Sequence, residues 1–162
     1  MAVYYVAMSL VTGFGYFTTH KKQSQKQNAC YLVFAFLLFT FLTSFRYAIG
    51  FDYFSYRNIY RMVIPWSFHD IFLYHRSEPF YYLACKLFSL TGCPFPVFLL
   101  FINLFLMAAA MHFISRNSKI PWVSVYLYLT LQFLAYNMNL IRQSIAAAFF
   151  LLAYPYLKNR RL

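Results

Sequence analysis

The chain has 162 residues, of which 62% are hydrophobic, 24% are aromatic and only 10% are charged. Because roughly a quarter of the residues in soluble domains are charged, this composition argues against a soluble globular protein. It also excludes intrinsic disorder, since disordered chains are poor in aliphatic and aromatic residues. The net charge of +11 would indicate nucleic-acid binding only if the cations formed one surface. Long apolar stretches separate them, so the composition indicates an integral membrane protein without a nucleic-acid partner.

Apolar runs long enough to cross a membrane recur along the chain. A helix needs about 20 largely apolar residues, and at least roughly 17, to cross the hydrocarbon core. We interpret the first run as a retained span and not as a signal peptide, because no cation precedes it and no small-residue cleavage site follows it. The sequence predicts five full spans, at 1–18, 29–45, 96–114, 120–136 and 140–157.

The positive charges set the expected orientation. Basic residues gather in the cytoplasmic loops of membrane proteins, and eight of the 14 cations form three groups that contain no acid. Assigning all three groups to the cytoplasm places the N-terminus outside and the C-terminus inside. These groups are Lys21/Lys22/Lys26, Arg116/Lys119 and Lys158/Arg160/Arg161.

The segment 79–91 is too short to be an ordinary span and has Lys86 at its middle. The three basic groups share one side only if this segment does not cross alone. We therefore expect a half-span or re-entrant helix, which requires protein or water to cover its backbone. A crossing paired with part of 59–73 is the alternative. The fold class predicted for residues 1–162 is a single all-α, polytopic transmembrane bundle with an external interfacial helix.

The segment 46–78 lies outside in this orientation and holds all three acids of the protein, together with four arginines. This mixture of charges indicates a site and not a topology signal. Aromatic and apolar residues also recur there with helical spacing, which predicts an amphipathic helix in the membrane interface with Arg57 and Arg61 on its flank. The stripe consists of Tyr53, Tyr56, Ile59, Tyr60 and Val63.

Two interpretations of this external helix stay open. The tyrosines alone fit an aromatic belt that anchors a surface helix. The arginine pair fits an anionic lipid head group or a pyrophosphate, because guanidinium groups donate bidentate hydrogen bonds to phosphate oxygens. Arg142 raises a similar choice at the outer mouth of the last span. It either faces a protein cavity with a partner or snorkels to the interface, and the adjacent amides of Asn139 and Gln143 favour the cavity.

Three stretches resemble the signatures of one family. Residues 46–53, with Tyr56 and Tyr60 after them, resemble the R-x-x-x-G-x-D-(Y/F)-x-x-Y pattern of the EpsG family, whose members are Wzy-like polymerases of bacterial exopolysaccharide and capsule. Residues 78–81 resemble its acid-(P/x)-G-(F/Y) segment, although a phenylalanine stands at the usual glycine. Residues 139–146 resemble its N-x-x-R-Q-x-(I/M)-A element. The resemblance covers only the N-terminal part of a typical member, so it implies a chain truncated relative to the family.

The resemblance implies polymerisation of oligosaccharide repeats carried on undecaprenyl pyrophosphate, at the outer face of the cytoplasmic membrane and without a metal or other cofactor. The implied partners are this lipid-linked oligosaccharide, the bilayer and other membrane proteins of polysaccharide assembly. The transfer needs an acceptor for the hydroxyl proton, cations for the departing pyrophosphate and an apolar groove for the lipid tail.

The external segments contain candidates for each role. We expect Asp52 or Glu78 to orient or deprotonate the acceptor hydroxyl, and Arg46 and Arg142 to clamp the pyrophosphate. Tyr53 and Tyr56 would line the sugar subsites or pack at the membrane edge. The expected catalytic residues are thus Asp52, Glu78 and Arg142, and the expected substrate- and pyrophosphate-binding residues are Arg46, Arg57, Tyr53, Tyr56, Asn139 and Gln143.

Several alternatives compete with this assignment. Arg46 and Asp52 would also make a structural ion pair at a span end. The cluster of histidines and acids at 69–78 matches no metal-ligand spacing, so we expect no metal site. As a function, a non-catalytic remnant or a subunit that needs a partner chain is the second hypothesis. A transporter or flippase fragment ranks lowest, because it requires charges at mid-membrane depth and only Lys86 is a candidate.

Overall fold

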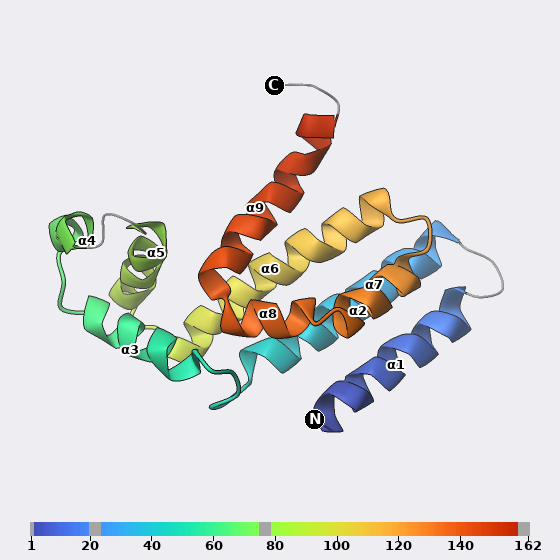
Figure 1. Ribbon diagram of the computed structural model, residues 1–162, viewed down its shortest axis with the longest axis horizontal. Helices are drawn as coiled ribbons and strands as arrows, with labels where there is room; N and C mark the ends of the chain where they lie inside the picture. Colours follow the sequence, from blue (N-terminus) through green and yellow to red (C-terminus); the bar gives the residue numbers. More distant parts are fainter. Residues whose placement is uncertain (1, 20–23, 75–78, 159–162) are drawn as a thin grey trace.

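A computed structural model describes residues 2–19, 24–74 and 79–158, and within these ranges the chain forms helices and no strand (Figure 1). The all-α prediction is therefore confirmed for the described chain. The helices in chain order are α1 (Ala2–Thr19), α2 (Gln25–Ser44), α3 (Tyr53–Val63), α4 (Phe68–Tyr74), α5 (Pro79–Leu90), α6 (Phe95–Asn117), α7 (Pro121–Thr130), α8 (Phe133–Asn139) and α9 (Ile141–Lys158).

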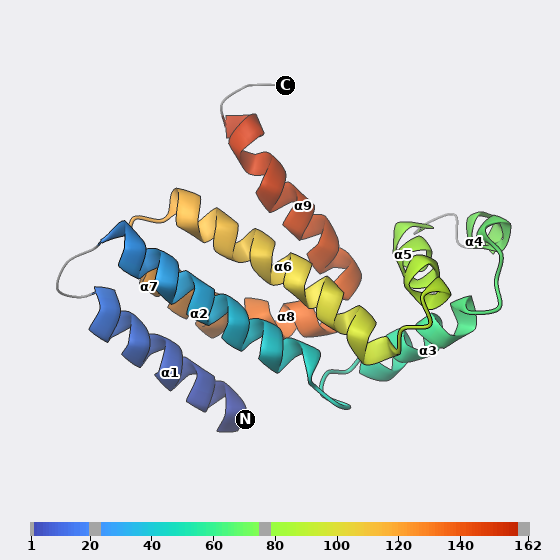
Figure 2. The same cartoon turned by 180° about the vertical axis from the view of Figure 1, so that it is seen from behind.

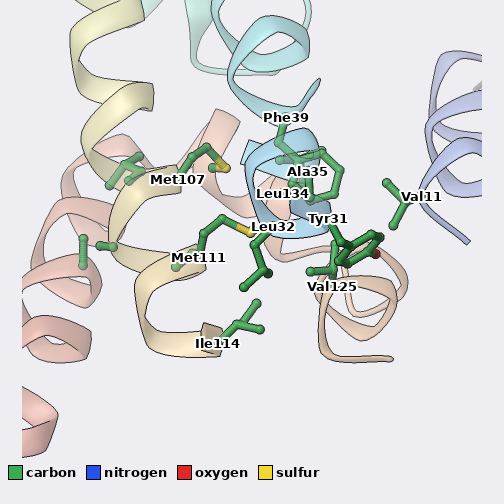
Figure 3. Close-up of a cluster of buried hydrophobic side chains, with 14 residues drawn as sticks. Val11, Tyr31, Leu32, Ala35, Phe39, Met107, Met111, Ile114, Val125 and Leu134 are labelled. Carbon is green, nitrogen blue, oxygen red and sulfur yellow. The ribbon is translucent and has the colours of Figure 1, made fainter. Parts of the chain in front are cut away.

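Helices α1, α2, α6 and α7 lie side by side, and α2 runs antiparallel to α6 (Figures 1 and 2). Their shared core is made of apolar side chains, among them Tyr31, Phe39 and Met107 (Figure 3). Large apolar side chains also cover the outer surface, including Phe41 on α2 and Phe101 on α6. A helix that is apolar all round belongs in a protein core or a membrane, so this outer surface is suited to lipid.

Two of the described helices, α2 and α6, are long and apolar enough to cross a membrane. The two spans predicted at 29–45 and 96–114 correspond to them. The full number of spans stays a prediction. The start of α2 is four residues earlier than predicted because Ser24 begins the helix: its backbone N–H donates to Gln27 Oε1 at 3.4 Å. This capping arrangement extends the helix into the polar stretch.

The span predicted over 120–136 is not one continuous helix, and its crossing of the membrane stays a prediction. The chain forms two shorter helices there, α7 and α8, because Gln132 adopts the left-handed conformation with a φ of 62°. The amide of Asn137 donates to the Tyr128 hydroxyl across the break, and the Tyr128 and Phe133 rings stack with centroids 5.7 Å apart. These contacts hold the broken segment together, so α7 and α8 still return the chain along α2 to the end where α2 stops.

The amphipathic helix predicted in the external segment is confirmed as α3, but its surroundings differ from the prediction. Its stripe, which includes Tyr53, Tyr56 and Tyr60, is buried in a second apolar cluster with residues of α5 and the start of α6. The Tyr60 hydroxyl also donates to the Cys93 carbonyl at 2.6 Å. Because other helices cover the stripe, the interpretation of its tyrosines as an aromatic belt is wrong. That α3 lies in the membrane interface stays a prediction.

The short segment predicted as a half-span forms α5, a helix of 12 residues that packs against α3 and α4. Lys86, near its middle, is buried, and its ammonium donates to the Ile64 carbonyl at 2.8 Å. Ile64 closes the C-terminal end of α3, where helix carbonyls lack intrahelical partners and the helix dipole favours a cation. The charge of Lys86 thus joins α5 to α3. Re-entry of α5 into the membrane stays a prediction.

Candidate functional site

The connection between α2 and α3 turns sharply and brings a buried arginine next to a glycine. Ala48 and Gly50 both have positive φ angles, of 55° and 105°, which fold the loop back on itself. Arg46 is only 5% exposed. A methyl group added to Gly50 would lie 3.2 Å from Arg46 Nη1. The guanidinium group therefore lies directly against the loop backbone.

Asn139 joins this loop to the corner between α8 and α9. Its side-chain oxygen accepts a hydrogen bond from the Phe51 N–H at 3.0 Å, and its amide donates to the Ala135 carbonyl at 3.1 Å. Its own carbonyl accepts a hydrogen bond from the Tyr56 hydroxyl at 3.3 Å. A methyl group on Gly50 would come within 2.8 Å of the same side-chain oxygen. The motif at 46–53 and the motif at 139–146 therefore meet around Asn139.

A shallow pocket of about 340 Å³ opens at this meeting point. A volume of that order lies at the lower end of the range for small-molecule sites. Backbone from the loop forms one side and the end of α8 forms the other. The lining residues are Ala48, Ile49, Gly50, Phe51, Met138 and Asn139.

The motif at 78–81 is connected to the other two through the second apolar cluster. The Tyr81 and Tyr56 rings contact each other with centroids 5.6 Å apart. Ile141, at the start of α9, belongs to the same cluster. Residues from all three motif stretches thus share one apolar cluster. Glu78, the expected acid of the second motif, lies outside the described residues.

The other charged candidates differ in their exposure. Asp52 is half-buried just before α3, and its carbonyl accepts the Tyr56 N–H at 2.9 Å. Arg57 is half-buried on α3. Arg142 and Gln143 are exposed on the first turn of α9, and the protein cavity expected to face Arg142 stays a prediction. The ion pair predicted between Arg46 and Asp52 stays a prediction.

The roles predicted for two tyrosines need correction. Tyr53 and Tyr56 are 3% and 4% exposed, which is too little to line a sugar subsite or the membrane edge. The Tyr53 ring instead packs edge-on against Phe95, with centroids 5.6 Å apart. Both side chains belong to the second apolar cluster. The helical spacing of the tyrosines showed that they share a face, but spacing does not show what covers a face.

Asp70, the remaining acid, has a structural role. Its carboxylate accepts hydrogen bonds from the Ser67 hydroxyl at 2.7 Å and from the Ser67 N–H at 2.8 Å. The bond from the Ser67 hydroxyl, followed by that from the backbone, lowers the pKa of Asp70. This is the reciprocal arrangement of a helix N-terminal cap. Asp70 therefore lies in the first turn of α4, where its carboxylate stabilises the start of that helix together with Ser67.

Gly50 should be essential to the geometry of the pocket. We expect Gly50→Ala to reduce function strongly, because alanine is strained at a φ of 105° and its methyl would overlap Asn139 Oδ1 at 2.8 Å. Such strain costs about 1–3 kcal/mol and would displace the bond between Phe51 and Asn139. The measurement is the thermal stability and pyrophosphate-lipid binding of the purified variant. Gly13→Ala is the matched control, since nothing lies within 4 Å of a methyl there; equal losses in both variants would contradict the prediction.

The fold and site define a helical membrane protein with a shallow pocket at one end of its bundle, built from two motifs far apart in sequence. The model of the EpsG family matches residues 29–162, and the chain belongs to the EpsG family. The match begins four residues after the start of α2, so the family assignment covers both motifs of the pocket. No curated protein and no solved structure matches the chain significantly.

Proposed function

We propose that this protein polymerises oligosaccharide repeats carried on undecaprenyl pyrophosphate during bacterial capsule or exopolysaccharide synthesis. Membership of the EpsG family supports a polymerase-like role. The observation that carries the proposal is the hydrogen bond between Phe51 N–H and Asn139 Oδ1, at 3.0 Å. It joins two motifs at one pocket, with the buried guanidinium of Arg46 beside it.

The chemistry proposed for this pocket is a glycosyl transfer. A hydroxyl of one repeat attacks the anomeric carbon of the growing chain, the bond to the lipid pyrophosphate breaks, and the pyrophosphate leaves with the bonding electrons. Asp52 or Glu78 accepts the hydroxyl proton. Arg46 and Arg142 stabilise the charge that develops on the departing pyrophosphate, with Arg57, Asn139 and Gln143 in support. The exposed apolar surface of the bundle accommodates the lipid tail.

The distribution of charge supports a site at the outer face of the membrane. Lys26 lies in the first turn of α2, and Arg116 and Lys119 flank the turn between α6 and α7. These ends of the helices lie at the opposite end of the bundle from the pocket (Figures 1 and 2). Basic residues mark the cytoplasmic side, so the pocket faces outwards, in the cytoplasmic membrane of a bacterium.

The proposal is tested in a bacterial host from which the corresponding polymerase gene has been deleted. We expect the expressed chain to restore long surface polysaccharide, seen as a ladder of chain lengths on a gel. Single repeats only, with the chain present in the membrane in normal amount, would contradict the proposal. They would favour the non-catalytic alternative, a subunit that requires a partner chain.

A further inference from the structure

Among the described residues, three polar side chains that each have an atom without a hydrogen-bond partner are buried on α2 and α6, two helices that pack against each other around an apolar core. Thr40 and Ser44 of α2 are 5% and 3% exposed, and Asn103 of α6 is 1% exposed. Within the described part of the chain, the two hydroxyl oxygens and the Asn103 amide nitrogen have no hydrogen-bond partner. Buried polar groups are normally hydrogen-bonded, because leaving them without a partner is costly. A ligand that supplies the missing partners would remove this cost.

In the part of the chain that the structure describes, the hydroxyl of Thr40 lacks the local hydrogen bond that other helical threonines make. Thr12, Thr18 and Thr43 each donate their hydroxyl to the carbonyl four residues earlier, at 2.7, 2.6 and 2.8 Å. This local bond is the usual way for a threonine hydroxyl to be satisfied inside an apolar helix. Thr43 lies on the same helix as Thr40 and is equally buried. The Thr40 hydroxyl therefore lacks a hydrogen-bond partner among the described residues because of its position in the helix and not because of its residue type.

The three side chains lie at neighbouring levels of the bundle. Figure 3 shows Leu32 of α2 next to Met111 of α6, and both belong to one core cluster. Thr40 follows Leu32 by eight residues and Asn103 precedes Met111 by eight. Because the two helices are antiparallel, each position is about 12 Å further along the interface in the same direction. Thr40 and Asn103 are therefore level with each other.

Further buried polar side chains follow Thr40 along the chain towards the pocket. Ser44 is one helical turn beyond Thr40 on the same face of α2, and the buried Arg46 follows it by two residues. The Arg46 guanidinium lies against Gly50, which lines the pocket. Thr40, Ser44, Arg46 and Asn103 thus form a buried column from the α2–α6 interface to the pocket floor. We call it the polar column.

The chemistry of the polar column favours an anion. A guanidinium group and an amide nitrogen only donate hydrogen bonds, and a hydroxyl can donate one. Donors grouped beside a cation in an apolar environment match the oxygens of a phosphate group, which only accept. We infer that the polar column binds phosphate oxygens of the lipid-linked pyrophosphate, with Thr40, Ser44 and Asn103 as additional binding residues. This inference rests on the proposed function, because that function supplies the pyrophosphate.

The test uses the full chain in lipid nanodiscs, with Thr40→Val and Asn103→Leu as variants. We measure the melting temperature without ligand and its rise with undecaprenyl pyrophosphate, since a ligand that binds the folded state raises stability. Each variant removes a donor that lacks a partner, so the ligand-free melting temperature should stay equal or rise. The affinity for undecaprenyl pyrophosphate should fall about 10- to 100-fold, as expected for loss of a hydrogen bond to a charged group.

Thr43→Val is the matched control, because its hydroxyl already donates to the Phe39 carbonyl; its affinity for undecaprenyl pyrophosphate should be unchanged. Inorganic pyrophosphate is the second probe. Competition by inorganic pyrophosphate that weakens in Thr40→Val and Asn103→Leu would support recognition of the phosphate oxygens themselves. Undiminished affinity in both variants would overturn the inference. So would a lower ligand-free melting temperature with unchanged affinity, because the groups would then bind structural water only.

The inference and the proposed function fail in different ways. A wild-type chain that binds undecaprenyl pyrophosphate through the polar column but makes no polymer would refute the proposed function and leave the inference standing. A chain that makes normal polymer when Thr40→Val and Asn103→Leu are combined, with normal affinity for undecaprenyl pyrophosphate, would refute the inference and leave the proposed function standing.

Discussion

Replacing Arg46 by lysine should lower polymer synthesis by about 100-fold or more while leaving the protein in the membrane. The substitution keeps the positive charge in a buried position, so the fold retains the cation that it was built around. It removes the planar pair of donors that matches two phosphate oxygens at once. Loss of about 3 kcal/mol of stabilisation of the departing pyrophosphate corresponds to roughly a 100-fold slower reaction. The measurement is polymer length and amount in the deletion host, together with the amount of protein in the membrane.

Arg61→Lys is the matched control for Arg46→Lys. Arg61 is exposed on α3, away from the residues that line the pocket. The same chemical change there should leave the polymer unaltered. Wild-type polymer from Arg46→Lys would show that the buried guanidinium has no part in the reaction, and would leave only its packing against the Gly50 loop to explain its burial.

The double substitution Asp52→Ala with Arg142→Ala should abolish the polymer completely. Asp52 ends the loop that lines the pocket, and Arg142 follows Asn139 by three residues. One substitution removes a candidate base and the other a candidate pyrophosphate ligand. Loss of general-base assistance alone typically costs about 10²- to 10⁴-fold in rate. Polymer is measured in the deletion host, as for Arg46.

Asp52→Asn separates catalysis from helix formation in this experiment. Asparagine is as good a residue as aspartate at the start of a helix, so α3 should form normally, while the candidate base is lost. We expect Asp52→Asn to insert normally and to make little polymer. Normal chain length from the double variant would exclude both residues from the reaction and remove the main support for the assigned roles.

Hydrophobic patterning predicted much of the fold, and the exceptions have local causes. The apolar runs indicated helices at α2 and α6 because nothing interrupts them. The break between α7 and α8 was missed because Gln132, with its φ of 62°, is neither glycine nor proline, so the sequence carries no breaker there. Its left-handed conformation depends on tertiary contacts such as the stack of Tyr128 on Phe133.

The environment of α3 illustrates a second limit. The period of its tyrosines predicted which residues share a face, and that face is buried as a unit. Period alone does not distinguish a face covered by lipid from one covered by protein. The contact of Tyr56 with Tyr81, with ring centroids 5.6 Å apart, comes from α5, whose packing position no local pattern encodes.

The candidate site was predicted in its parts but not in its arrangement. Motif order identified Arg46, Asp52 and Asn139 as residues of interest. That the Asn139 side chain accepts a bond from the Phe51 N–H depends on how α8 meets the loop after α2, which is a tertiary property. The polar column was missed for a related reason. Thr40 and Asn103 are single polar residues within long apolar runs, and only their burial without partners distinguishes them from threonines bonded within a helix.

The most direct test of the central claim is polymerisation by the purified chain in lipid vesicles supplied with oligosaccharide repeats on undecaprenyl pyrophosphate. We expect a ladder of products longer than one repeat, release of undecaprenyl pyrophosphate for each bond formed, and no ladder from the double variant at Asp52 and Arg142. Single repeats alone, from a wild-type chain that is folded and binds undecaprenyl pyrophosphate, would contradict the claim.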